Sequence, residues 1–278
     1  MEDSLANVLV STVPFASHDR LPLELLDAVD AHVTINPLGR RLQEEDLAEL
    51  IATTEILIAG TEPITRKVLN AAPDLRLIAR VGIGLDNVDL VAARERGIQV
   101  TYTPEAPAPA VAEFTVGLMV SLLRHTHTAN ALLHNGVWNR LMGRRLGDST
   151  VGVIGVGRIG SRVIQILSSF GVQRLIAHDI EPRSDLIQGT YVEWVSPDEV
   201  FREADIVSLH VPLTPDTLNM VCRKQLDLMK TDAVLINTSR GGVVDEAELL
   251  RALQDERLGG AAIDVFTCGE HTMPEKAC

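Results

Sequence analysis

The sequence predicts an α/β protein built from two parallel-sheet domains. Short β-rich runs alternate with helical segments through most of the chain, and short connections join them, as in parallel strands linked by helices. A glycine-rich turn, Gly155-Val-Gly-Arg-Ile-Gly160, lies between one predicted strand and the next helix. A proline-rich break at 103–109 separates the two alternating regions. We therefore expect a first domain over 1–102 and a second over 103–278.

The composition excludes several classes of protein. The chain has 278 residues, 46% of them hydrophobic, which is enough for two domains that each have a core. The formal net charge is −13 and no basic run occurs, so we expect neither nucleic acid nor a membrane surface as partner. The three cysteines lack metal-site spacing, and no signal or membrane segment is evident. These features favour a cytoplasmic protein with reduced thiols and no bound metal.

The first domain should contain five strands and four helices. The β-rich runs predict strands at 7–11, 32–35, 56–59, 76–79 and 99–102. The helical patterns lie at 22–29, 44–51, 66–71 and 89–96. No glycine fingerprint occurs in this region, so we do not expect it to bind a dinucleotide.

The second domain should open with one long helix over 110–135, because three prolines disfavour helix before it. Its apolar residues recur at helical spacing and predict a core face: Val111, Phe114, Leu118, Met119 and Leu122. An exposed loop over 136–150 follows. Beyond the glycine turn we expect helices at 158–170 and 245–258, and strands at 206–211, 233–238 and 261–266. Ser196-Pro-Asp-Glu199 has the pattern of a capping box and predicts another helix start.

The glycine turn carries the strongest functional signal. Gly155 permits the tight turn, Gly157 lets the backbone approach a pyrophosphate, and Gly160 allows close packing of helix on strand. Arg158 and Ile159 begin the helix, whose free N–H groups favour phosphate. The alternative is a glycine turn without a ligand. The strand–turn–helix context favours a dinucleotide cofactor.

An acidic residue after the next strand indicates which dinucleotide is bound. Asp179 follows Gly160 by nineteen residues, at the end of the second predicted strand. In that place a carboxylate accepts hydrogen bonds from a ribose 2′-hydroxyl and repels a 2′-phosphate. We therefore expect NAD rather than NADP.

Polar residues also follow the later strands of the second domain, where ligands of open parallel sheets bind. Arg240, close after Thr238, is placed to hold a carboxylate, although it could also be a surface arginine paired with an acid. Asp264 could bind the nicotinamide carboxamide, or cap a turn. His210 and Pro212 would line the adenine or nicotinamide side of the cofactor, although a structural role for the histidine is equally compatible. We assign Thr238 to the cofactor as well.

The first domain offers one further candidate anion site. Arg80, Gly82 and Ile83 follow the predicted strand at 76–79, so the two N–H groups and the arginine could hold a carboxylate. A glycine-rich turn without a ligand explains the same residues.

These segments, in this order, resemble the D-isomer-specific 2-hydroxyacid dehydrogenases, and most of all their phosphoglycerate dehydrogenases. The resemblance extends from about residue 7 to residue 266. The matching motifs are Arg80-x-Gly-x-Gly-x-Asp-Asn-x-Asp89, Val111-Ala-Glu113, Gly136-x-Trp-x-Arg140, Gly155–Gly160 with Asp179, His210-Val-Pro-Leu-Thr214, Asn237-x-x-Arg-Gly-Gly242 and Asp264-Val-Phe266.

The resemblance implies a flavodoxin-like substrate domain and a Rossmann NAD-binding domain. It also implies hydride transfer between NAD(H) and a small 2-hydroxy or 2-oxo acid, with 3-phosphoglycerate as one candidate. Arg240 would hold the carboxylate and the carbonyl. A histidine would protonate the carbonyl oxygen, and a glutamate would orient this histidine and raise its pKa. Members of the family usually form homodimers through the segment that matches 110–148.

The chain departs from the family near its last residues. The family's glutamate position is occupied by Gly269, with Glu270 beside it, and His271 comes too early to match the family's histidine. We expect the usual C-terminal segment to be missing or replaced. Ala106-Pro107 also stands where many relatives have Gly-Asn. Three interpretations follow: an enzyme in which Glu270 is catalytic, an NAD-binding module without catalysis, or a truncated form.

Overall fold

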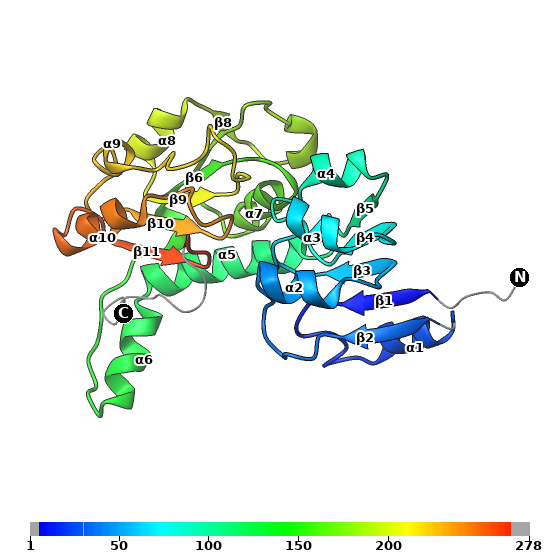
Figure 1. Cartoon of the computed structure of the whole chain (residues 1–278). Helices are drawn as coiled ribbons and strands as arrows, with labels where there is room; N and C mark the ends of the chain where they lie inside the picture. Colours follow the sequence, from blue (N-terminus) through cyan, green and yellow to red (C-terminus); the bar gives the residue numbers. More distant parts are fainter. Residues whose placement is uncertain (1–5, 30, 268–278) are drawn as a thin grey trace, which may run out of the picture. The chain divides into compact units, whose positions relative to one another are not determined.

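The computed structural model describes residues 6–29 and 31–267 and consists of two compact units, Met1–Pro107 and Ala108–Cys278 (Figure 1). The division falls at Pro107, within the proline-rich segment, rather than at residue 102. The reason is that helix α5 begins at Ala108 and packs against helix α7 of the second unit. The last residues of the proline-rich segment therefore belong to the second unit.

The first unit is a parallel five-stranded sheet in the order β2-β1-β3-β4-β5. This strand order is that of flavodoxin, which confirms the predicted fold. Its elements are β1 (Asn7–Val10), α1 (Leu21–Asp27), β2 (His32–Ile35), α2 (Glu44–Leu50), β3 (Ile56–Ala59), α3 (Arg66–Ala71), β4 (Leu77–Arg80), α4 (Leu90–Glu95) and β5 (Gln99–Tyr102).

Side-chain caps begin two helices of the first unit, and its core lies under α2, α3 and α4. Thr65 accepts a hydrogen bond from the Val68 N–H, and Asp89 accepts one from the Ala92 N–H. These caps satisfy N–H groups that have no partner within the helix. Helix α1 contributes nothing to the core, because none of its residues 21–27, all of them described, is buried.

The second unit is a parallel six-stranded sheet in the order β11-β10-β9-β6-β7-β8. Counted within the unit, this is the Rossmann order 3-2-1-4-5-6 in reverse direction, as predicted. Its helices and strands are α5 (Ala108–Leu123), α6 (Thr126–His134), β6 (Thr150–Ile154), α7 (Arg158–Ser169), β7 (Arg174–His178), β8 (Glu193–Trp194), α8 (Pro197–Glu203), β9 (Ile206–Leu209), α9 (Arg223–Leu226), β10 (Val234–Asn237), α10 (Glu246–Gln254) and β11 (Gly260–Ile263). Two 3₁₀ turns, Leu146–Asp148 and Ser184–Ile187, complete it.

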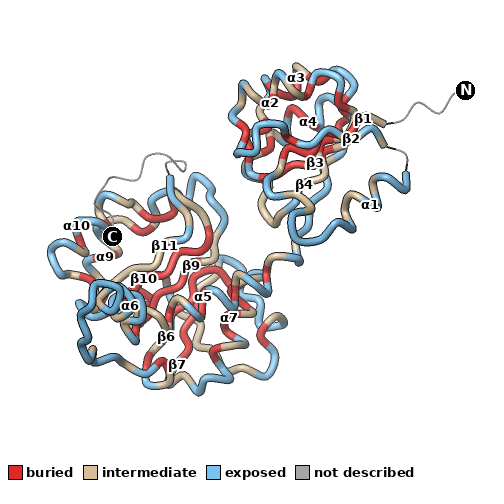
Figure 2. The backbone as a smooth tube through the Cα atoms, turned by 90° about the horizontal axis from the view of Figure 1, so that it is seen from below, coloured by how far each residue is buried: buried red, intermediate tan, exposed pale blue. Residues whose placement is uncertain are grey.

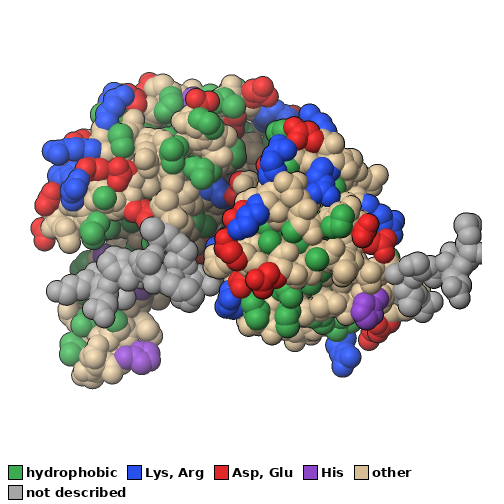
Figure 3. Space-filling model, in the orientation of Figure 1, with side chains coloured by type: hydrophobic (Ala, Val, Ile, Leu, Met, Phe, Trp, Pro, Cys, Tyr) green, Lys and Arg blue, Asp and Glu red, His purple; other side chains and the backbone are tan. Residues whose placement is uncertain are grey.

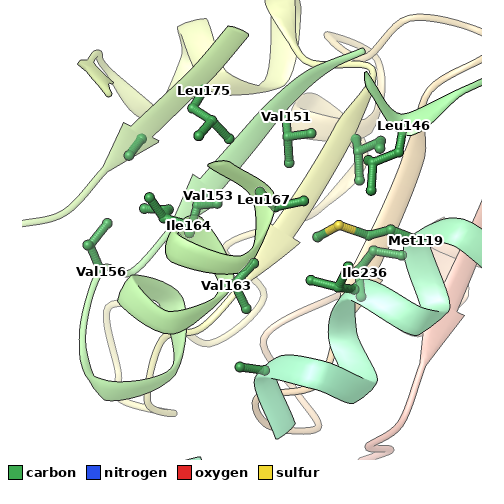
Figure 4. Packing of buried hydrophobic residues seen from close by; sticks show 14 of the residues in the cluster. Met119, Leu146, Val151, Val153, Val156, Val163, Ile164, Leu167, Leu175 and Ile236 are labelled. Atoms are coloured by element: carbon green, nitrogen blue, oxygen red, sulfur yellow. The ribbon is translucent and has the colours of Figure 1, made fainter. Parts of the chain in front are cut away.

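Helices cover both faces of the second sheet. Successive residues of a strand point to opposite faces, so neighbouring residues belong to different cores. Val153 packs under α5 and α7, whereas the next residue, Ile154, packs under α8, α9 and α10. Figure 2 shows the buried residues concentrated on the strands, and Figure 4 shows side chains of α5 and α7 meeting those of β6 and β10. This double covering explains why β6, β9 and β10 are nearly continuous apolar runs.

The prediction of one helix over 110–135 is wrong. Helix α5 ends at Leu123, His125 has the left-handed conformation with φ +52°, and α6 begins at Thr126. A left-handed residue interrupts the hydrogen-bond ladder, so the chain turns away from the core. None of the described residues 126–134 is buried. The predicted core residue Phe114 is also 48% exposed, whereas Met119 is fully buried.

The capping box at Ser196 is present. Its hydroxyl accepts from the Glu199 N–H at 3.3 Å, and the Glu199 carboxylate accepts from the Ser196 N–H at 2.9 Å. In the part of the chain covered by residues 6–29 and 31–267, no helix is both long and apolar enough to cross a membrane.

Candidate active site at the carboxyl edge of the second sheet

The predicted ligand residues of the second unit share one edge of its sheet. All six strands are parallel, so their carboxyl ends lie together. Strand β6 leads into Gly155, and its neighbours β7 and β9 lead into Asp179 and His210. Beyond β9, strand β10 leads toward Arg240 and β11 leads into Asp264 (Figure 1). The glycine turn therefore has Asp179 on one side and the other three residues on the opposite side.

The glycine turn has two crowded positions and one open position. Gly155 has φ +92°, and a Cβ on it would lie 2.6 Å from the His210 carbonyl oxygen. A Cβ on Gly160 would lie 2.0 Å from the Gly155 carbonyl oxygen. Within the described part of the chain, nothing approaches within 4 Å of a Cβ on Gly157. The turn is thus packed on its protein side and open at Gly157, where α7 begins with Arg158 and Ile159.

Asp179 contacts the same turn. Its Oδ2 accepts a hydrogen bond from the Val156 N–H at 2.6 Å, and its Oδ1 accepts one from the Glu181 N–H at 2.9 Å. These bonds fix the carboxylate beside the open part of the turn. An adenine dinucleotide needs open backbone for its pyrophosphate and an acidic acceptor for its ribose. The open turn and Asp179 supply these two groups, so the residues present fit the predicted cofactor.

His210 is held beside the turn as a neutral ring. Its Nε2 lies 2.9 Å from the Ser208 hydroxyl, while its enclosed Nδ1 has no hydrogen-bond partner among the described residues. Burial lowers the pKa of His210 to about 4, so the ring carries no charge at pH 7. Pro212 is exposed, and its carbonyl accepts a hydrogen bond from Thr217 at 2.6 Å.

A buried asparagine shapes the turn that carries Arg240. Asn237 Nδ2 donates to the Arg240 carbonyl at 3.0 Å, and its Oδ1 accepts from the Ser239 N–H at 3.1 Å and the Ser239 hydroxyl at 2.7 Å. The Arg240 Nη1 donates to the Ser239 carbonyl at 2.7 Å. We assigned no role to Asn237 from the sequence. An asparagine at a strand end before a Thr-Ser-Arg-Gly-Gly run is the available signal, since asparagine bonds to the backbone of such turns.

The Asp264 turn packs directly on the Arg240 turn. The Asp264 N–H donates to the Asn237 carbonyl at 3.0 Å, and a Cβ on Gly241 would lie 2.2 Å from the Phe266 carbonyl oxygen. Partial burial raises the pKa of the Asp264 carboxyl group. Arg240 and Asp264 are therefore kept close together by their backbones. The other predicted catalytic residue, Glu270, lies outside the described residues.

The structure gives two predicted ligand residues other partners. The buried Thr238 hydroxyl lies 2.9 Å from that of Thr115 in α5, which joins the end of β10 to the helix, and its contact with a cofactor stays a prediction. In the first unit, the Gly82 N–H donates to the Thr103 hydroxyl at 2.8 Å. Arg80 ends β4 and Ile83 is half-buried in the loop that follows.

The chain is similar to a known family over its second unit. Residues 116–276 match the family model described as "D-isomer specific 2-hydroxyacid dehydrogenase, NAD binding domain". This match covers more than half of the chain and includes the glycine turn, Asp179, Arg240 and Asp264.

Individual relatives extend the similarity into the first unit. The chain is 40% identical over 230 residues to a D-3-phosphoglycerate dehydrogenase of Methanocaldococcus jannaschii, which covers 81% of this chain and 44% of that protein. It is 38% identical over 232 residues to a hydroxypyruvate reductase of Thermotoga maritima, covering 82% of this chain and 74% of the relative. A solved D-lactate dehydrogenase of Aquifex aeolicus, complexed with NAD and lactic acid, superposes with TM-score 0.81 at 30% identity over 94% of this chain and 77% of that one. The chain thus spans less than half of the first relative and about three quarters of the others.

Two glycine substitutions should separate folding from cofactor binding. Gly160→Ala should lower the free energy of unfolding by about 3 kcal/mol, because its Cβ collides with backbone. Gly157→Ala should change that free energy by less than about 0.5 kcal/mol, because the position is open. It should nevertheless weaken NADH binding at least about tenfold, because its Cβ fills space where we expect the pyrophosphate. Urea unfolding and NADH fluorescence titration measure the two effects, and unchanged NADH affinity in Gly157→Ala would contradict the role of the turn.

Burial of His210 should make stability depend on pH. The unfolded chain protonates this ring near its ordinary pKa of 6.5, whereas the folded protein resists protonation until about pH 4. The contribution of the neutral ring to the free energy of unfolding is fully present above pH 6.5. It should be lost as the pH drops from 6.5 to 4, which lowers that free energy by at most about 3 kcal/mol. Urea unfolding of wild type and His210→Gln at several pH values measures the difference. Parallel curves for the two proteins would show that the ring is not buried in this way.

Proposed function

Because the chain belongs to the D-isomer-specific 2-hydroxyacid dehydrogenases, we propose that it transfers a hydride between NAD(H) and a small 2-hydroxy or 2-oxo acid. The observation that carries the proposal is the shared sheet edge of the second unit. There the open glycine turn, the Asp179 carboxylate and the joined Arg240 and Asp264 turns follow neighbouring strands. A turn for a pyrophosphate and an arginine for a carboxylate are the two recognition elements that such a reaction needs.

The residues around the glycine turn hold the cofactor. When bound, NADH supplies the hydride. The open backbone at Gly157 and the N-terminus of α7 would hold the pyrophosphate, because the first N–H groups of a helix and its dipole both favour negative charge. Asp179 accepts a hydrogen bond from the ribose and repels a 2′-phosphate, so NADH is preferred to NADPH. Asp264 would bind the nicotinamide, and neutral His210 would line the adenine or the nicotinamide side.

Arg240 holds the substrate carboxylate, and its planar guanidinium can do so through two parallel hydrogen bonds. Arg80, at the carboxyl end of β4, is assigned to substrate binding as well. Relatives named for phosphoglycerate, hydroxypyruvate and glyoxylate support a short 2-hydroxy or 2-oxo acid, with 3-phosphoglycerate among the candidates. The catalytic role of Glu270 remains a prediction.

We also propose that the protein forms a homodimer through residues 126–142, which we call the arm. Figure 1 shows α6 projecting from the second unit, and Figure 3 shows hydrophobic and histidine side chains on this projection. Beyond α6, two large apolar side chains of the arm are exposed: Trp138 is 75% exposed and Met142 is 85% exposed. Large exposed apolar side chains on a projecting segment favour contact with another protein surface.

Steady-state assays test the proposed reaction. Oxidation of NADH should be measured with glyoxylate, pyruvate, hydroxypyruvate and 3-phosphohydroxypyruvate, and in parallel with NADPH. We expect turnover with at least one acid and a preference for NADH. Arg240→Ala should lower kcat/KM at least about a hundredfold, the effect of losing a charge-assisted pair, and leave NADH affinity within about twofold.

Arg251→Ala is the matched control, because Arg251 is an exposed arginine of the same unit that pairs with Glu248 on the surface of α10. It should behave as wild type. NADH binding without turnover of any of the four acids would contradict the proposed reaction. Equal loss of NADH binding and turnover in Arg240→Ala would contradict the role of Arg240 alone.

Sedimentation velocity tests the dimer. Trp138→Ala should raise the dimer dissociation constant at least about tenfold, because buried tryptophans dominate many interfaces. Tyr191→Ala is the control, since Tyr191 is an aromatic residue exposed to 84% on a different segment. A wild-type protein that stays monomeric at tens of micromolar would refute the proposal.

A further inference from the structure

We propose that Asn87 is a positioning residue that orients the guanidinium of Arg80 for substrate binding. The inference rests on the proposed function, because it takes Arg80 as a substrate-binding residue. It adds a residue to which the sequence motif assigned no role, and it derives that role from contacts within the first unit alone.

Asn87 lies in the loop after β4 and uses both ends of its side-chain amide. Its Oδ1 accepts a hydrogen bond from the Arg80 Nε at 3.4 Å. Its Nδ2 donates to the Gly60 carbonyl at 3.1 Å and to the Glu62 carbonyl at 2.7 Å. The side chain therefore links the end of β4 to the loop that follows β3.

The loop that receives the Nδ2 bonds is itself fixed. Glu62 is only 2% exposed, and its Oε1 accepts hydrogen bonds from the Gly60 N–H at 2.8 Å and from the Ser11 hydroxyl. A Cβ on Gly60 would lie 2.6 Å from the Thr12 hydroxyl, so this loop packs closely on the end of β1. A buried carboxylate that accepts two hydrogen bonds restrains such a loop. Breaking either bond would leave the carboxylate with too few hydrogen bonds to replace those it made to water. Asn87 is thus anchored on a rigid base.

Arg80 is confined on its other side by Gly82. The arginine is 8% exposed, and a Cβ on Gly82, where φ is +148°, would lie 2.1 Å from the Arg80 Nη1. The guanidinium therefore lies against bare backbone at Gly82, where its Nη1 donates to the Val81 carbonyl while its Nε donates to Asn87 Oδ1. A long flexible side chain held in one orientation loses less entropy when it binds an anion.

This arrangement predicts which kinetic constant changes. Asn87 does not deliver or remove a proton, so it should act on substrate binding through Arg80. Asn87→Ala should raise the KM for the 2-oxo acid about tenfold, by analogy with the loss of a hydrogen bond to a charged group, and change kcat less than about twofold. In an Arg80→Ala background, the same substitution should have no further effect on KM.

Two further variants separate positioning from stability. Asn87→Gln keeps an uncharged amide with an acceptor for Arg80 on a longer side chain, so KM should stay within about threefold of wild type even if the melting temperature falls. Asn36→Ala is the matched control, because Asn36 is a buried asparagine of the same sheet edge that donates to the Ser11 and Arg40 carbonyls. It should lower the melting temperature and leave KM unchanged. A rise in KM that is the same with and without Arg80 would overturn the proposal.

A spectroscopic measurement decides the question without turnover. The ¹⁵N-edited spectrum of the Arg side chains should contain an Arg80 Nε–H signal, assigned by its absence in Arg80→Lys, that exchanges slowly with water. This protection should be lost in Asn87→Ala and retained in Asn36→Ala. Protection that survives in Asn87→Ala would refute the positioning role. If no 2-oxo acid is reduced but protection behaves as expected, the proposed reaction fails and the positioning of Arg80 stands.

Discussion

The close approach of helix α7 to the turn after β6 is the contact on which the second unit depends. Gly160 lies so near the Gly155 carbonyl that no side chain fits between them, and Gly155 in turn lies against the His210 carbonyl. The helix N-terminus, the turn and the end of β9 are therefore fixed relative to one another. Because these groups are already in place, a phosphate group would meet N–H donors that need no rearrangement.

Each unit holds an arginine at the carboxyl end of a strand by means of a nearby asparagine. Asn87 accepts from the Arg80 side chain, whereas Asn237 donates to the Arg240 backbone carbonyl. The first contact restrains a guanidinium, and the second restrains the turn from which a guanidinium extends. The net charge of the chain is −13, which repels an anion at long range. Arginines held in place near the ends of the strands supply positive charge locally.

Local patterns predicted most elements of the fold. Apolar runs and helical periodicity located all the strands and helices of the first unit, and the Ser196 capping box located α8, because these signals depend only on neighbouring residues. The break between α5 and α6 was missed. His125 adopts a left-handed conformation that no pattern of neighbours demands, and the residues after it have no core to pack on.

The sequence by itself determined the parallel α/β fold, the glycine turn and the acidic residue at the end of β7, since each depends on order and spacing along the chain. Only the tertiary structure decided which hydrogen-bond partners the polar atoms of these residues have. The Gly82 N–H is paired with Thr103, and the Thr238 hydroxyl is paired with Thr115, which lies far away in the sequence. Hydrogen-bond partners are set by which segments pack together, and spacing within one segment carries no information about that packing.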